Sequence, residues 1–179
     1  MTLNEILPTV SKYNALLVTG AQRSGTTIAA HILAHELGYR YVDEDAIDID
    51  NQYKALDVLK QGKVVLQAPA LCHIAHNFTK RLNYCVVLMR RPIEDILKSE
   101  NRINWRTAYS GMNLLVEQKK YAEQFGMYGE NIAAIKYFCF ENFQKHLCDN
   151  VELDYDSLKT HPMFKDERRE FQSRQWEAA

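Results

Sequence analysis

The sequence contains no run of about 18 uninterrupted apolar residues, which is the length that a membrane-spanning helix requires. Its opening residues, MTLNEILPTVSKYN, contain no basic segment followed by a long apolar stretch, the pattern of a secretory signal. We therefore expect a soluble, cytoplasmic protein with no membrane partner.

Cysteine is also scarce, and no two cysteines form a Cys-x-x-Cys pair. The four are Cys72, Cys85, Cys139 and Cys148, and two of them lie inside apolar runs. This scatter favours reduced, mostly buried thiols over a disulfide framework or a zinc knuckle.

Neither sign of charge dominates the chain. Its 22 Lys and Arg residues nearly balance 23 Asp and Glu residues, for a formal net charge of -1. A long-range field that recruits nucleic acid is therefore excluded, and any anion site must be local. With 179 residues, 46% of them hydrophobic, only seven glycines and no repeats or linker, we expect one domain spanning residues 1–179.

Short apolar segments alternate with segments of helical periodicity, which is typical of βαβ units around a parallel sheet. The predicted strands are residues 15–19, 40–42, 63–68, 84–89 and 132–136. The predicted helices are residues 26–37, 51–61, 70–81, 92–102 and 107–125, with a final helix placed on the sheet by Phe171 and Trp176.

The segment VTGAQRSGTT departs from the rule for a nucleotide-hydrolysing loop, G-x-x-x-x-G-K-[ST]. Gly20, Gly25 and Thr27 fit that spacing, but Thr26 occupies the lysine position. A strand, a glycine turn and a helix start still bring backbone N–H groups and the positive end of a helix together, which favours binding of an anion. We call residues 20–27 the phosphate loop.

The strands that follow also lack the acidic residue that organises magnesium in ATP chemistry. The runs KVVLQAP and YCVVLMRRP end without Asp or Glu. A transferred group with less negative charge than a γ-phosphoryl group needs less neutralisation and can dispense with a metal. A sulfuryl group meets this condition.

The phosphate loop resembles the 5′-phosphosulfate loop of sulfotransferases, a basic residue followed by S-G-T-T. The resemblance implies a three-layer α/β/α P-loop NTPase-like fold with a parallel five-stranded sheet in the order 2-3-1-4-5. It also implies 3′-phosphoadenosine 5′-phosphosulfate (PAPS) as donor, adenosine 3′,5′-bisphosphate as product, and no metal. Arg23 then lies beside the sulfate and the bridging oxygen, and the residues that cradle the 5′-phosphate are Ser24, Gly25, Thr26 and Thr27.

A second motif, VVLMRRPIEDILKSENR, is similar to the family's 3′-phosphate segment. In that segment an arginine ends a strand, a proline stands two residues later, and a serine is the eighth residue after the arginine. Arg90 and Pro92 match, but Lys98 is the eighth residue and Ser99 the ninth. Either the helix begins differently, or Lys98 replaces the serine as phosphate ligand. The similarity extends over residues 16 to 102.

Transfer to a hydroxyl or amine requires a general base near the acceptor atom. Cytosolic sulfotransferases carry a histidine at the end of the third strand, where this sequence has Gln67. Other branches use a glutamate after the second strand, and YRYVDEDAIDID supplies Glu44 there, with Asp43 and Asp45 as neighbours. The same acidic segment is equally typical of a solvated loop, and His73 is a second candidate base.

Of three possible functions, we expect the first, an enzyme that is a PAPS-dependent sulfotransferase acting on a small-molecule or glycan acceptor. The second is a kinase for a nucleotide or small molecule, because HILAHELGYRYVDEDAI also resembles the segment after the P-loop of nucleoside-monophosphate kinases. The third is a nucleotide-binding module without catalysis. The acceptor and the oligomeric state do not follow from the sequence.

His31 and His35 lie four residues apart on one predicted helix, with Glu36 adjacent. This spacing suits metal ligands, but the order differs from H-E-x-x-H and the sequence shows no third ligand. We therefore expect no metal.

Overall fold

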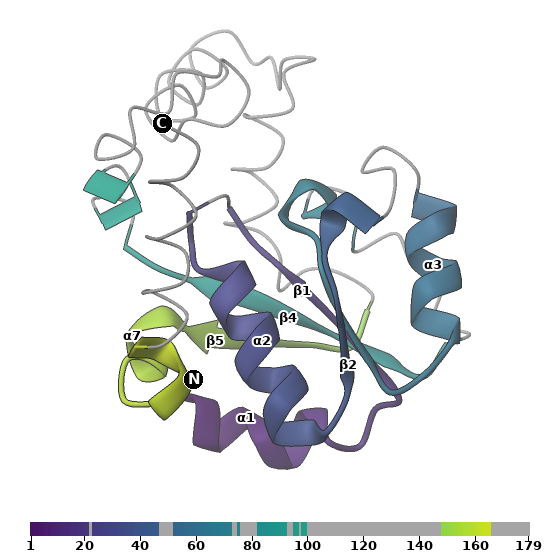
Figure 1. Ribbon diagram of the computed structural model, residues 1–179, viewed down its shortest axis with the longest axis horizontal. Helices are drawn as coiled ribbons and strands as arrows, with labels where there is room; N and C mark the ends of the chain where they lie inside the picture. Colours follow the sequence, from purple (N-terminus) through teal and green to yellow (C-terminus); the bar gives the residue numbers. More distant parts are fainter. Residues whose placement is uncertain are drawn as a thin grey trace, which may run out of the picture.

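The computed structural model describes residues 1–21, 23–46, 52–72, 75, 82–92, 95–96, 98–99 and 148–165. Its centre is a 5-stranded sheet in the order β2-β3-β1-β4-β5 (Figure 1). All neighbouring strands in this sheet run parallel. The expected fold class, a three-layer α/β/α P-loop NTPase-like arrangement with this strand order, is confirmed.

The strands are β1 (Ala15–Thr19), β2 (Arg40–Val42), β3 (Val64–Gln67), β4 (Tyr84–Arg90) and β5 (Asn150–Asp154). The α-helices are α1 (Leu3–Val10), α2 (Thr26–Leu37), α3 (Gln52–Lys60) and α7 (Tyr155–Leu158). Two short 3-10 helices, η1 (Glu44–Ala46) and η2 (Pro69–Leu71), follow β2 and β3.

Two separate hydrophobic cores cover the two faces of the sheet. On one face, α1, α2 and α7 bury side chains such as Ile6, Leu33 and Leu158. On the other face, α3 and η2 bury Leu59 and Leu71. Because helices cover both faces, every residue of β1 and β3 is buried, and these strands are apolar nearly throughout.

Local sequence patterns predict the elements around β1 correctly. The predicted bounds of β1, α2 and β2 coincide with the observed ones. The predicted α3 and β3 are one residue too long at each end, and the predicted β4 is one residue too short at its C-terminal end. Helix α2 ends where expected, because Gly38 caps it with a left-handed φ of 64° that glycine adopts without strain.

The fifth position in the sheet belongs to a strand that the sequence did not predict. β5 (NVELD) lies at the edge of the sheet and alternates buried Val151 and Leu153 with less buried polar residues. It therefore contains no continuous apolar run that would predict a strand. Helix α1 was also not predicted. The predicted strand 132–136 and the final helix with Phe171 and Trp176 lie outside the described residues.

The parallel arrangement gathers the carboxyl ends of all five strands at one edge of the sheet. The phosphate loop leaves β1 at that edge, and α7 leaves β5 there (Figure 1). In open parallel sheets ligands bind at this edge. Within the described ranges, no helix is both long and apolar enough to cross a membrane.

The described cysteines should be inert in the folded protein. Cys72, Cys85 and Cys148 are buried and form no disulfide. Desolvation, with smaller effects of Asp149 and Cys148, raises the pKa of Cys85 to about 12. Because the thiolate is the nucleophile, we expect these three thiols in a Cys139→Ser variant to resist a thiol reagent at neutral pH and to react after unfolding. The absorbance of the released reagent measures the reaction, and rapid labelling of these thiols in the native variant contradicts their burial.

Candidate functional site

The phosphate loop turns sharply between β1 and α2. Three of its residues have positive φ values, 146° at Gly20, 66° at Arg23 and 96° at Gly25. The amide of Ser24 donates to the carbonyl of Ala21 at 3.1 Å, which closes the turn. Gly25 is the N-cap of α2 and offers no capping side chain, so the first N–H groups of this helix have no partner within it.

The hydroxyls of the loop differ in their surroundings. Ser24 is fully buried, and its Oγ has no hydrogen-bond partner among the described residues. Thr26 is buried as well, whereas Thr27 is exposed. An unpartnered buried hydroxyl costs about 1–3 kcal/mol, and Ser24 directly precedes Gly25, the N-cap of α2.

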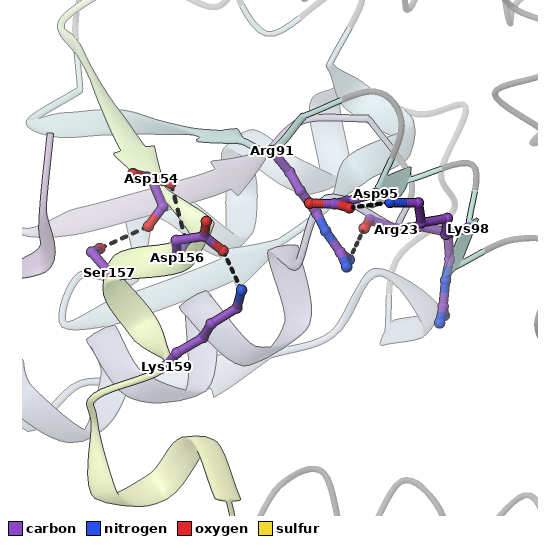
Figure 2. Close-up of polar contacts among 8 residues, drawn as sticks. All are labelled: Arg23, Arg91, Asp95, Lys98, Asp154, Asp156, Ser157 and Lys159. Carbon is purple, nitrogen blue, oxygen red and sulfur yellow. Dashed lines mark hydrogen bonds and ion pairs between the residues drawn. The ribbon is translucent and has the colours of Figure 1, made fainter.

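Arg91 supports the backbone of this loop. Its Nη1 donates a 2.8 Å hydrogen bond to the carbonyl oxygen of Arg23, the residue with the left-handed conformation (Figure 2). The guanidinium carbon of Arg91 also lies 4.2 Å from the centre of the Tyr155 ring. A charged hydrogen bond and a cation–π contact together hold the turn in place.

Tyr155 fills the space beside the start of α2. A Cβ placed on Gly25 meets Cδ2 and Cε2 of the Tyr155 ring at 2.4 and 2.6 Å. Only a residue without a side chain therefore fits there. The loop thus contacts both the Tyr155 ring of α7 and Arg91, the residue that follows β4.

Hydrogen bonds around the start of α7 fix the position of Tyr155. The carboxylate of Asp154 accepts from the amide of Asp156 at 3.0 Å, and Ser157 Oγ donates to the carbonyl of Asp154 at 2.7 Å (Figure 2). Asp156 also pairs with Lys159 at 2.5 Å. These bonds fix the backbone on both sides of Tyr155.

The second sequence motif meets the loop through Ser99. Ser99 is buried, and its Oγ accepts from Nε and Nη2 of Arg23 at 3.3 and 3.2 Å. Lys98 instead has a side chain that is 77% exposed and pairs with Asp95 at 3.4 Å (Figure 2). Of the two alternatives, the structure brings Ser99 to the loop and leaves Lys98 at the surface.

Arg90, the last residue of β4, has a carboxylate partner. Its Nη2 lies 2.6 Å from Oε1 of Glu152 on the neighbouring strand β5, and both side chains are about three-quarters buried. The role of Arg90 as ligand of a 3′-phosphate stays a prediction, and a phosphate at this guanidinium shares it with Glu152.

On the other side of the loop, a series of polar contacts leads to the acidic segment after β2. Gln67 Nε2 donates to Thr26 Oγ1 at 3.4 Å, and the hydroxyl of Tyr41 lies 3.4 Å from Gln67 Oε1. The same hydroxyl donates to Oδ2 of Asp43 at 2.5 Å. The carboxylate of Asp43 is therefore connected to the first turn of α2.

The remaining candidate bases are less closely connected. Glu44 begins η1 directly after Asp43 and is half-buried. Asp45 lies in the same turn, and His73 lies outside the described residues. The choice of Glu44 as general base stays a prediction.

Sequence reasoning missed the supporting residues Arg91, Tyr155 and Gln67. One signal pointed to Arg91, because Ser99 is the eighth residue after Arg91, the separation that the family pattern has between its arginine and serine. No local signal identified Tyr155, since it lies far from the loop in the sequence and follows a strand that was not predicted.

No family model matches this chain, and no curated protein does. Among solved structures, it is similar to shikimate kinase from Acinetobacter baumannii in complex with shikimate, with 16% identity, a TM-score of 0.46, and coverage of 77% of this chain and 95% of that one. Shikimate kinase from Bacteroides thetaiotaomicron gives 11% identity, a TM-score of 0.41, and coverage of 73% and 96%. At these values the similarity supports no conclusion about ligand or reaction.

Replacement of Gly25 should show the constraint imposed by Tyr155. Because the new Cβ collides with the ring at a φ of 96°, we expect Gly25→Ala to lower the free energy of unfolding by about 3 kcal/mol. The matched control is Gly38→Ala, where φ is 64° and nothing lies within 4 Å of the new Cβ; the expected cost there is about 1 kcal/mol. Urea unfolding measures both, and equal losses contradict the proposed contact.

Proposed function

We propose that the phosphate loop binds the phosphate of a nucleotide and that the protein transfers a group from this nucleotide to an acceptor. The observation that carries the proposal is the buried Ser24 hydroxyl, which has no partner among the described residues and lies next to the uncapped start of α2. Phosphate oxygens accept hydrogen bonds from such hydroxyls and N–H groups, and the positive end of α2 favours their charge.

The side chains around the loop favour PAPS as donor. Thr26 stands where a nucleotide-hydrolysing loop has lysine, and its hydroxyl pairs with the neutral side chain of Gln67. A sulfuryl group carries less charge than a γ-phosphoryl group, so these neutral partners suit it. When bound, PAPS supplies a sulfuryl group for transfer to a hydroxyl or amine.

Two groups of residues hold such a donor in this proposal. Ser24, Thr26, Thr27 and the backbone of the phosphate loop bind the 5′-phosphate. Ser99 and Arg90 lie towards the 3′-phosphate, as the resemblance to sulfotransferases implies. The contact between Ser99 and Arg23 supports this arrangement, because it brings the two motifs together across 76 residues of sequence.

Arg23 has the central chemical role in this proposal. Its guanidinium bonds Ser99 and its carbonyl bonds Arg91, so both ends of the residue are held. A guanidinium fixed in this way stabilises the negative charge that develops on the leaving phosphate without reorganising during the reaction. Glu44 then removes the proton of the acceptor, with Asp43 as the alternative base.

A phosphoryl donor with magnesium is the second candidate, and one observation favours it. Asp43 is connected through Tyr41 and Gln67 to Thr26, as described above. Carboxylates near a phosphate loop are the usual ligands of magnesium in phosphoryl transfer. A kinase-like reaction therefore requires the acidic segment after β2, rather than the end of β3, to supply the metal ligand.

A titration with two ligands distinguishes these donors. We expect adenosine 3′,5′-bisphosphate to bind the purified protein and to raise its melting temperature, since a ligand at 100 times its dissociation constant adds about 2.7 kcal/mol of stability. ATP with magnesium should have a smaller effect. The reverse order selects the phosphoryl donor, and no response to either ligand contradicts the proposed function.

Variants of two adjacent arginines identify their different roles. Because Arg91 supports the loop backbone, we expect Arg91→Ala to weaken whichever phosphate ligand binds about tenfold or more, the range for loss of a charged hydrogen bond. Arg90→Ala should weaken the bisphosphate alone.

Isothermal titration calorimetry measures these affinities, and Lys60→Ala is the control, since Lys60 pairs with exposed Asp57 on α3. A bisphosphate affinity that survives both arginine substitutions contradicts this assignment of the site.

A further inference from the structure

The C-terminal end of α2 carries a group of possible metal ligands that is separate from the phosphate loop. His35 and Glu36 lie in the last turn of the helix, about 15 Å from its start at a rise of about 1.5 Å per residue. His161, from the segment after α7, completes the group. Among the described residues this is the one set of three in which potential ligand atoms all lie within 4.8 Å of one another.

Two of the three distances between the ligand atoms are close to those around a tetrahedral ion. Oε1 of Glu36 lies 3.2 Å from Nδ1 of His35 and 3.2 Å from Nε2 of His161. For zinc bonded at about 2.0–2.2 Å to nitrogen and oxygen, neighbouring ligand atoms are separated by roughly 3.4 Å. Small movements of the side chains therefore suffice to place an ion among the three atoms.

The donor set is also the one that zinc prefers. Two imidazoles and one carboxylate form the ligand set of many zinc sites, and a water molecule completes the tetrahedron. The side chains are 64% exposed at His35, 34% at Glu36 and 13% at His161, so the ion has a path from solvent.

Binding of the ion replaces the two hydrogen bonds between the histidines and Glu36, and it changes a third hydrogen bond as well. The amide of Met163 lies 3.3 Å from Nδ1 of His161, so Nδ1 accepts and Nε2 carries the proton that faces Glu36. An ion bound to Nε2 replaces that proton, which requires Nδ1 to carry the hydrogen and to release the amide of Met163. At 3.3 Å this is a long hydrogen bond, and its loss is a small cost beside three bonds to a metal.

We propose that His35, Glu36 and His161 bind a divalent transition-metal ion, with zinc as the best fit. The ion joins α2 to the segment that follows α7, across 125 residues of sequence. Phe164 in that segment packs in the same core as Leu33 of α2 and contacts Tyr155 through its ring. The metal therefore fastens the segment that supports Tyr155, and it does so independently of the reaction at the phosphate loop.

Calorimetric titration of the full chain with zinc chloride, together with the visible absorption of the cobalt(II) form, tests this site. The expected result is one ion per chain and a cobalt spectrum typical of four or five ligands. His35→Ala and His161→Ala should each weaken zinc at least about tenfold, because even loss of an outer contact to a ligand costs 10–100-fold.

His31→Gln is the matched control, since His31 lies one turn earlier on the same helix and should leave zinc affinity unchanged. Because His35 is mostly exposed, His35→Ala should fold normally, so that a loss of binding in this variant reflects a lost ligand. Absence of binding to the wild type overturns the proposal, and so does equal affinity in the wild type and both alanine variants.

Discussion

The contact between the Tyr155 ring and the backbone of Gly25 is the constraint on which the site depends. The ring occupies the volume that any side chain at this position needs. The chain can therefore pass from β1 into α2 only through a residue without Cβ, and this tight passage leaves the first N–H groups of the helix open. These open N–H groups are thus a consequence of packing as well as of loop sequence.

Support for this turn comes from the segments that follow two other strands, β4 and β5. β4 leads into Arg91, which bonds the carbonyl of Arg23, and β5 leads into Tyr155, which lies on Gly25 and beneath the guanidinium of Arg91. The parallel sheet makes the convergence possible, because all strands end at the same edge. The two hydrophobic cores hold the strands in place, so they also fix the positions of the residues at the strand ends.

The chemistry of the loop differs from that of ATP-hydrolysing proteins in where its charge lies. Neutral groups, Thr26 and Gln67, occupy the first turn of α2 and the end of β3. Positive charge comes instead from Arg23 and Arg91, and negative charge from Asp43 after β2. In the proposed function, this distribution suits a donor whose transferred group needs little neutralisation. The same proposal assigns the phosphate to the loop and the uptake of the acceptor proton to the acidic segment.

Local patterns in the sequence were sufficient for β1, α2, α3 and the phosphate loop. The signals for these elements arise from interactions between near neighbours in the chain. They are an apolar run for a strand, a helical period for a helix, and a glycine where an element ends. Tertiary structure alone decided that Ser99 rather than Lys98 reaches Arg23, because one residue rotates a side chain by about 100° around a helix and the helix start is set by packing. It also decided the positions of β5, Tyr155 and His161. Tyr155 and His161 contact the loop or α2 only after the sheet has formed. Contacts between segments so far apart in the chain produce no periodic pattern in the sequence.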